Sequence, residues 1–243
     1  MKVQLSIGRN TYPIETAINY DLHYSDVIAI AENKILQNLL GPLCDNASVL
    51  DIGAGTGLVA DITQPSLYAA TDVSDDMLKV LTSKHPESFT ACADLQTESG
   101  INLFIEQVKV LAPFDVITSV FAAHLMGSNQ VTLLRALRDL LNPGGTLVWH
   151  GNWPARKRRA PGAGSRTVFE EFCNDFDHRT SKQMVKEAGF VGIDVHRLNA
   201  FPDILANRVP DRSLRALIAG SKVIPSRLHY HGAIIAKKPL GAL

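Results

Sequence analysis

The 243-residue chain has only three cysteines, no excess of charge of either sign and no long hydrophobic run. Cys44, Cys92 and Cys173 show neither metal-ligand spacing nor a disulfide framework, so we expect free thiols in a reducing compartment and no metal site. Lys plus Arg and Asp plus Glu both number 24, which argues against a nucleic-acid partner. No apolar run approaches the roughly 18 residues that a membrane-spanning helix needs, so no membrane contact is expected.

Residues 1–10 lack the charged and then apolar pattern of a secretion signal, which makes a cytoplasmic location the expectation. Hydrophobic residues make up 46% of the chain, enough for a substantial core. The length suits one large α/β domain, alone or with an added cover.

Strand-like and helix-like patterns alternate along the chain. Strands are predicted at residues 49–52, 66–72, 89–93, 114–120, 146–150, 190–197 and 231–236. Helices are predicted at residues 24–40, 57–62, 77–84, 101–110, 129–141 and 180–188, with Gly41-Pro42 ending the first. The alternation predicts an α/β fold with a seven-stranded, mostly parallel sheet and helices on both faces.

The domain organisation follows from the same pattern. Residues 1–45 are expected to form an N-terminal helical cover, and residues 46–243 the ligand-binding domain. Segments 153–179 and 202–227 follow strands but fall outside the alternation. We expect them to form a small inserted lid at the end of the sheet where ligands bind in open α/β folds.

A glycine-rich turn, VLDIGAGTG at residues 49–57, follows the first strand. Its glycines let the backbone turn tightly and bring a ligand against bare peptide groups. Asp72 ends the second strand, 21 positions after Asp51, where a carboxylate can accept hydrogen bonds from ribose hydroxyls. Nicotinamide dehydrogenases share both features, but their G-x-G-x-x-G fingerprint is replaced here by Gly57 followed by Leu58. The dehydrogenase alternative is therefore disfavoured.

With these motifs the chain resembles class I S-adenosylmethionine-dependent methyltransferases over roughly residues 20–150. The resemblance extends to Asp94 after the third strand, the Phe114-Asp115 pair that leads the fourth, and LLNPGGTL at residues 140–147. It implies a Rossmann-like fold whose last strand is antiparallel. It also implies S-adenosyl-L-methionine as the cofactor.

The cofactor-binding residues implied by the resemblance are Asp51, Gly53, Ala54, Gly55, Asp72, Val73, Met77, Asp94, Leu95, Ser119 and Tyr20. Asp51 would anchor the ammonium group, directly or through water, and Asp72 would hold the ribose diol. Val73 and Met77 would line the adenine, whose amino group Asp94 would bind. Alternatively, Asp51 and Asp72 cap the helices that follow them, and Asp94 is an ordinary loop aspartate.

The acceptor side has fewer signals. Tyr20 and Tyr24 resemble aromatic residues that close over the cofactor in small-molecule members, although they could simply pack a helix on the sheet. His124 follows the fourth strand, where a neutral imidazole could accept a proton from the acceptor; a structural histidine is the alternative. His124 and Tyr24 are therefore the candidate catalytic residues. The candidate substrate-contact residues end the fifth strand: His150, Asn152 and Trp153.

The reaction expected from these features is methyl transfer to a small metabolite. No Asn-Pro-Pro-Tyr or Asp-Pro-Pro-Tyr follows the fourth strand, where residues 119–122 read SVFA, and this disfavours a nucleobase or protein-glutamine acceptor. One alternative is attack at another sulfonium carbon, with aminocarboxypropyl transfer or cyclisation releasing methylthioadenosine. Another is a binding module without catalysis, which the intact Asp51, Asp72 and glycines argue against.

Overall fold

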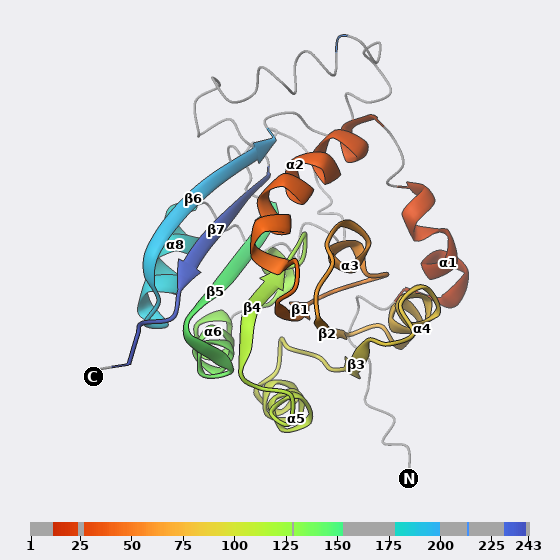
Figure 1. Cartoon of the computed structure of the whole chain (residues 1–243). Coiled ribbons are helices and arrows are strands. Elements are labelled where there is room, and N and C mark those ends of the chain that lie inside the picture. The colour runs from red at the N-terminus through yellow and green to blue at the C-terminus, as the bar shows by residue number, and fades with distance from the viewer. Residues whose placement is uncertain are drawn as a thin grey trace, which may run out of the picture.

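The computed structural model describes residues 12–23, 27–127, 129–152, 178–199 and 231–241, together with Ser213. Its centre is a seven-stranded sheet with the order β3-β2-β1-β4-β5-β7-β6 (Figure 1). The strands are β1 (Ser48–Ile52), β2 (Leu67–Asp72), β3 (Phe89–Cys92), β4 (Phe114–Ser119), β5 (Leu141–Asn152), β6 (Val191–Asn199) and β7 (His231–Lys237). Strand β7 is antiparallel to β5 and β6, whereas the pairs among β1 to β5 are parallel. The predicted sheet type and its antiparallel last strand are confirmed.

Helices cover both faces of this sheet (Figure 1). They are α1 (Ile14–His23), α2 (Val27–Cys44), α3 (Leu58–Ile62), α4 (Asp75–Lys84), α5 (Glu98–Val108), the 3-10 turn η1 (Ala123–Leu125), α6 (Gln130–Asp139) and α8 (His178–Glu187). One core lies under α2, α3 and α4 and includes Leu36, Leu40, Val59 and Leu81. The other lies under α5, α6 and α8 and includes Phe104, Leu133 and Val185.

Strand β1 contributes side chains to both cores in alternation. Val49 packs in the core under α2, whereas Leu50 and Ile52 pack in the core under α5. Because successive side chains of a strand point to opposite faces, Asp51 lies on the α2 face. Burial on both faces explains why β1 reads as a nearly continuous apolar run interrupted by a single carboxylate.

The predicted end of the first long helix at Gly41-Pro42 is wrong, because α2 continues to Cys44 with Pro42 inside it. Pro42 falls in the last turn, where a missing N–H removes only one helical hydrogen bond. Leu40 and Cys44 are fully buried against the sheet on either side of it. Their burial outweighs the lost bond, and the helix ends only where the chain turns toward β1.

The boundary between α6 and β5 also differs from the prediction. Helix α6 ends at Asp139, and β5 begins at Leu141 rather than at Thr146. Residues 142–145, between the predicted helix and strand, form part of the strand, with a register shift where Phe114 pairs with Leu141 and Val116 with Thr146. The glycines therefore permit an irregular strand start as well as a turn.

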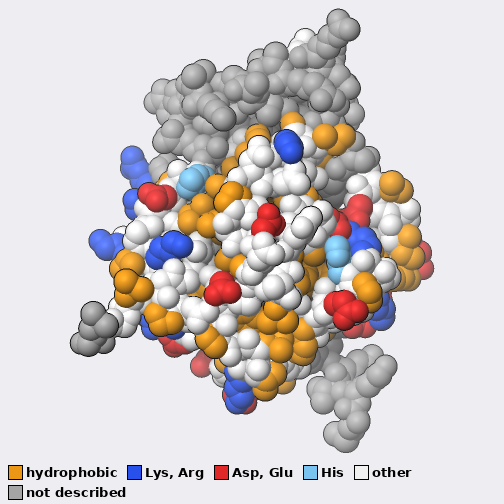
Figure 2. Space-filling view, in the orientation of Figure 1, with side chains coloured by type: hydrophobic (Ala, Val, Ile, Leu, Met, Phe, Trp, Pro, Cys, Tyr) orange, Lys and Arg blue, Asp and Glu red, His pale blue; other side chains and the backbone are white. Residues whose placement is uncertain are grey.

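The N-terminal part of the chain contains two helices rather than the single one predicted. Helix α2 packs on the sheet, and α1 lies beside α4 (Figure 1). On the face shown in Figure 2, the coloured acidic and basic side chains are scattered among hydrophobic ones, without a continuous patch of one sign. Most of the two predicted lid segments, 153–179 and 202–227, lies outside the described residues.

Asp115 joins three strands at the amino edge of the sheet, opposite the predicted cofactor site. Its Oδ2 accepts hydrogen bonds from the Ser48 amide (3.0 Å) and hydroxyl (2.7 Å), and its Oδ1 accepts from Asn142 Nδ2 (2.8 Å). The two Ser48 bonds, helped by Asn142, hold the pKa of the Asp115 carboxyl below its ordinary value. Asp115 therefore connects β1, β4 and β5 through hydrogen bonds of its side chain.

We predict that Asp115→Ala lowers the free energy of unfolding by about 1 kcal/mol, since an exposed carboxylate loses three hydrogen bonds. Because folding lowers this pKa, the stabilisation is present above the ordinary aspartate range and disappears as pH falls through the folded value. Urea unfolding of both proteins at pH 7 and pH 3 measures it. Asp115→Ala should bind cofactor normally; lost binding with unchanged stability would contradict the assignment.

Candidate active site

The glycine turn lies at the carboxyl edge of β1, folded toward β2. The amides of Gly53 and Ala54 both donate to the carbonyl of Thr71, at 2.8 and 2.9 Å. Gly53 has a φ of +68°, and a Cβ added to it would lie 2.4 Å from the Cβ of Ala122, so only glycine fits there. A Cβ on Gly55, in contrast, would meet no described atom within 4 Å. The turn is therefore closed against the loop after β4 and open at Gly55.

Asp72 connects this turn to the start of α4. Its Oδ2 accepts from the Gly55 amide and its Oδ1 from the Ser74 amide, each at 2.9 Å. Burial raises the pKa of the Asp72 carboxyl, and the hydrogen bonds from the Ser74, Gly55 and Val73 amides oppose that shift. Capping of the next helix, the alternative role of Asp72, is wrong, because the N-cap of α4 is Ser74. Asp72 instead orders both loops that border the site.

Asp51 is buried and holds together the strands on either side of β1. Its Oδ2 accepts from the Tyr68 hydroxyl of β2, and its Oδ1 accepts from the Thr118 hydroxyl of β4, both at 2.7 Å. Burial raises the pKa of Asp51 to about 6; the two hydroxyl bonds lower it, and the nearby charge of Asp72 raises it further. A buried carboxylate whose described hydrogen-bond donors are all neutral retains a strong affinity for a cation.

The predicted adenine-side residues lie on the loops after β2 and β3. Met77 and Leu95 are buried, and Val73 is half-buried at the end of β2. Asp94 is half-buried, and its Oδ1 accepts from the Gln96 amide at 3.0 Å. A Cβ on Gly100 would lie 1.8 Å from the Asp94 carbonyl oxygen, so α5 starts directly against this loop. The structure brings these residues to the same edge as Asp72.

Helix α1 is attached at both ends to the loops around the glycine turn. At its start, the Ser74 hydroxyl donates to the Tyr12 carbonyl (3.1 Å), and the Tyr12 ring contacts the Tyr20 ring edge-on at 5.5 Å. Near its end, Asp21 accepts a hydrogen bond from the Thr56 hydroxyl in the glycine turn. The predicted Tyr20 therefore lies on a helix that bridges the cofactor loops.

Lys84 strengthens the second attachment. Its Nζ lies 3.0 Å from Asp21 of α1 and 2.7 Å from Asp61 of α3, and Asp61 also contacts His85 Nε2 at 2.7 Å. Burial alone would lower the pKa of the Lys84 ammonium, but the bonds to Asp61 and Asp21 outweigh burial and raise it. One ammonium therefore connects α1, α3 and α4.

The loop after β4 leaves the sheet through an unusual backbone turn. Phe121 has a φ of +57°, a conformation that costs a non-glycine residue roughly 1–2 kcal/mol. Its amide donates to Nδ1 of His150 at 2.9 Å, and the two rings pack edge-on with centroids 4.5 Å apart. Ser119, just before this turn, is buried, and its Oγ has no hydrogen-bond partner among the described residues.

Several other predicted site residues lie wholly or partly outside the described part of the chain. His124 lies in η1 and Asn152 ends β5, but their side chains are outside the described part of the chain. Tyr24 and Trp153 lie outside it altogether, as does Cys173. Cys44 and Cys92 are free thiols, and burial raises the pKa of Cys44 to about 12.

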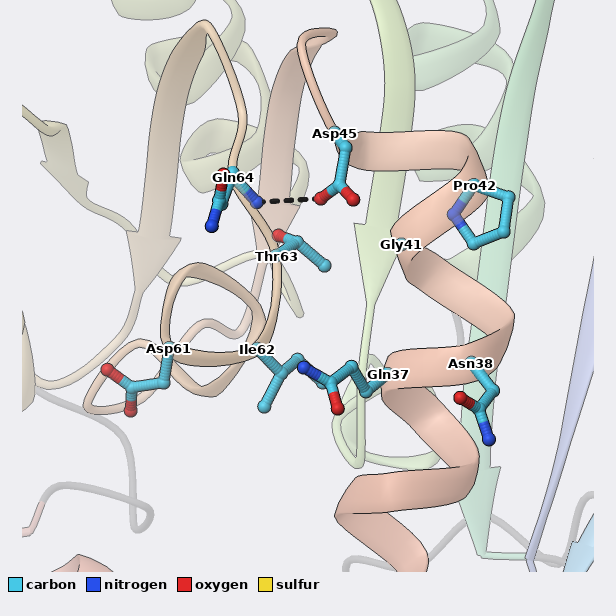
Figure 3. A pocket seen from close by; sticks show the side chains of 9 residues that line it. All are labelled: Gln37, Asn38, Gly41, Pro42, Asp45, Asp61, Ile62, Thr63 and Gln64. Carbon is cyan, nitrogen blue, oxygen red and sulfur yellow. Dashed lines mark hydrogen bonds between the residues drawn. The ribbon is translucent and has the colours of Figure 1, made fainter.

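A separate polar groove of about 530 Å³ lies between α2 and α3 (Figure 3). It is lined by Gln37, Asn38, Gly41, Pro42, Asp45, Asp61, Ile62, Thr63 and Gln64. Asp45 accepts from the Gln64 amide at 2.8 Å, just before β1 and β2 begin. That end of the groove is therefore at the amino edge of the sheet, away from the glycine turn.

Among the described residues, no three His, Cys, Asp or Glu side chains are grouped as metal ligands would be. None of the described helices has the length and apolar character needed to cross a membrane.

Comparison with known proteins indicates the kind of domain that contains this glycine turn. Residues 50–147, from β1 into β5, match a family model described as a methyltransferase domain. This part of the chain is therefore a methyltransferase domain, and the fold around it is that of class I S-adenosylmethionine-dependent methyltransferases. The domain match and the fold together indicate S-adenosylmethionine as the cofactor and methyl transfer as the activity.

Solved structures share the fold of this methyltransferase at low sequence identity. An S-adenosylmethionine-dependent methyltransferase from Mesorhizobium loti is 17% identical over 86% of this chain and 99% of that one, with a TM-score of 0.59. Another solved structure is phosphoethanolamine N-methyltransferase 2 from Haemonchus contortus, in complex with phosphomonomethylethanolamine and S-adenosylhomocysteine. It is 17% identical over 95% of this chain and 58% of that chain, with a TM-score of 0.59. The [4+2]-cyclase SpnF is 17% identical over 85% of this chain and 82% of that chain, with a TM-score of 0.54. No curated protein matches the chain in sequence.

The methyltransferase site fits this cofactor chemically. The glycine turn is open at Gly55, and Asp51 and Asp72 place carboxylates at two neighbouring strand ends, where an ammonium and a ribose diol need acceptors. The Ser119 hydroxyl keeps hydrogen-bonding capacity for a group outside the described residues.

We predict that Asp51→Asn separates stability from cofactor binding. A carboxyl pKa raised from 3.8 to about 6 by folding makes the ionised form costly above pH 6, by up to roughly 3 kcal/mol. The amide removes that cost, so the variant should unfold at an equal or higher urea concentration at pH 7, and its advantage should shrink toward pH 4. Calorimetry should show at least tenfold weaker S-adenosylmethionine binding. A variant much less stable at pH 7 would contradict this.

We predict that Lys84→Met loosens α1 of the methyltransferase, since it removes the charge between Asp21 and Asp61. Amide hydrogen exchange in α1 should rise about fivefold, or about 1 kcal/mol. Lys79→Met is the matched control, because the described ion pairs of Lys79 lie within α4, with Asp75 and Asp76. Equal exchange in the two variants would show that Lys84 does not hold α1.

Proposed function

We propose that this methyltransferase transfers the methyl group of S-adenosylmethionine to a nucleophile on a small metabolite. The observation that carries the proposal is the pair of carboxylates, Asp51 and Asp72, on either side of a glycine turn open at Gly55. The neutral net charge and the sequence SVFA at residues 119–122 favour a small acceptor over a nucleic acid or protein. The phosphoethanolamine N-methyltransferase of the same fold, solved with a small phosphorylated amine, supports that choice by analogy.

The cofactor supplies an electrophilic methyl carbon on a sulfonium, and the chain supplies binding and orientation. Asp51, which is mostly ionised at pH 7, would hold the ammonium group. Asp72 would bind the ribose diol while keeping the Gly55 loop in place. Val73, Met77 and Asp94 would bind the adenine. Because these contacts fix the reacting carbon and exclude water, positioning supplies most of the catalysis.

A general base is needed only if the acceptor nucleophile arrives protonated. His124 remains the candidate for that role because η1 follows β4 at the carboxyl edge of the sheet. Tyr24 remains the candidate for closing the site from the N-terminal side, in the short segment between α1 and α2.

The competing function is attack at a different sulfonium carbon, which would use the same carboxylates and glycines. The cyclase SpnF has this fold, and its reaction is not methyl transfer. The products separate the two possibilities, because methyl transfer leaves S-adenosylhomocysteine and the alternative leaves methylthioadenosine.

The function is tested by incubating the protein with S-adenosylmethionine alone, and then with a panel of small amines, alcohols and their phosphate esters. We expect S-adenosylhomocysteine and an acceptor heavier by one methylene unit, detected by mass spectrometry, only when an acceptor is present. If methylthioadenosine forms without acceptor, methyl transfer is refuted and the activity is cyclisation. Transfer to nucleic acid or protein with none to the panel would refute the small-molecule acceptor.

We predict that Asp72→Ala weakens S-adenosylhomocysteine binding at least tenfold, because two hydrogen bonds to the ribose are lost. Asp75→Ala is the control: it removes an exposed carboxylate three positions away, whose ion-pair partner among the described residues is Lys79. Isothermal titration calorimetry measures both. Unchanged affinity of Asp72→Ala would leave this residue only its structural role at Gly55 and Ser74.

A further inference from the structure

His150 is a fully buried histidine whose ring is hydrogen-bonded to the backbone. It lies on β5, and its Nδ1 is 2.9 Å from the backbone nitrogen of Phe121. A backbone N–H can only donate, so Nδ1 must carry a lone pair and no proton. The neutral ring then bears its single hydrogen on Nε2.

The residue that receives this bond is the one in an unfavourable backbone conformation. Phe121 has a φ of +57°, and such a conformation persists only where surrounding contacts enforce it. His150 provides two of these contacts, the Nδ1 bond and the edge-on packing of the two rings at 4.5 Å. Strand β5 therefore fixes the direction in which the chain leaves β4.

The direction of the chain at Phe121 in turn places Ala122 against the glycine turn. Ala122 follows directly, and its Cβ occupies the space where a Cβ on Gly53 would lie, 2.4 Å away. Gly53 begins the turn that bears the open position at Gly55. A contact chain thus runs from β5 through the Phe121 turn to the cofactor loop.

We propose that His150 is a positioning residue that shapes the cofactor loop through Phe121 and Ala122, rather than a residue that contacts the substrate. The imidazole works as a neutral acceptor at Nδ1. Its Nε2 carries hydrogen and does not accept a proton, so His150 is not the general base. The inference rests on the cofactor of this family and does not depend on the proposed acceptor.

Three substitutions of His150 separate the two ring nitrogens. Asn places its Oδ1 as many bonds from Cα as Nδ1 of histidine, so His150→Asn keeps an acceptor for Phe121. Gln matches the reach of Nε2 instead, so His150→Gln would preserve a contact to substrate. His150→Phe keeps a ring and removes both nitrogens. His196→Asn, on β6, is the control for replacing a strand histidine with an amide.

The readouts need no acceptor and no turnover, so a failure of the proposed reaction leaves them interpretable. Nuclear magnetic resonance of the ¹⁵N-labelled full chain gives the exchange rate of the Phe121 amide. Long-range nitrogen–proton correlation identifies which nitrogen of His150 is protonated in the unmodified protein. Calorimetry gives the affinity for S-adenosylhomocysteine.

We expect the unmodified protein to carry its proton on Nε2. His150→Asn should keep the exchange rate of the Phe121 amide and the affinity within about threefold, like His196→Asn. His150→Gln and His150→Phe should raise the exchange rate and weaken the affinity by about tenfold or more. Each of these shifts corresponds to loss of one hydrogen bond that holds a strained turn.

Several results would overturn the proposal. A proton on Nδ1 in the unmodified protein would exclude the bond, and this measurement does not depend on any variant folding. Better retention of both readouts in His150→Gln than in His150→Asn would assign the function to Nε2 and return His150 to the substrate side. Normal affinity in all three variants would show that the Phe121 turn does not shape the cofactor loop.

Discussion

A single buried carboxylate ties the centre of this sheet to its chemistry. Asp51 accepts one hydrogen bond from each neighbouring strand, donated by the hydroxyls of Tyr68 in β2 and Thr118 in β4. Both bonds are made by neutral donors, so they align the three strands without neutralising the charge. The residue that registers the strands is therefore also the one that keeps a negative charge available for a cationic ligand, and the raised pKa is the energetic cost of combining the two roles.

The elements of the fold were largely predictable because period-two and helical apolar patterns coincide with burial on both faces of the sheet. The errors arose where a local signal was overruled by packing. Gly41-Pro42 has the composition of a helix end, yet buried Leu40 and Cys44 keep α2 helical through it. Residues 142–145 have the composition of a turn, yet pairing of β5 with β4 begins before them. Such tertiary contacts are not encoded in short windows of sequence.

The candidate site was predictable only in part. Asp51, Gly53, Gly55 and Asp72 carry a spacing that can be recognised in the sequence. Tyr68 and Thr118, which hold Asp51, were missed, although strand alternation places all three on one face of the sheet. Asp21 and Thr56 were missed for a different reason: a contact between residues 35 positions apart leaves no periodic signal. The tautomer of His150 likewise depends on the backbone turn at Phe121, which no residue pattern in the sequence predicts.

The attachment of α1 also has a consequence for the order in which the chain assembles. The partners of Asp21 follow it by 35 residues, at Thr56, and by 63 residues, at Lys84. A ten-residue helix is marginal in water without tertiary support. The first described helix to leave the ribosome therefore lacks part of its attachment until Lys84 of α4 has been synthesised. We expect α1 to dock late in folding, over a glycine turn that β1 and β2 have already shaped.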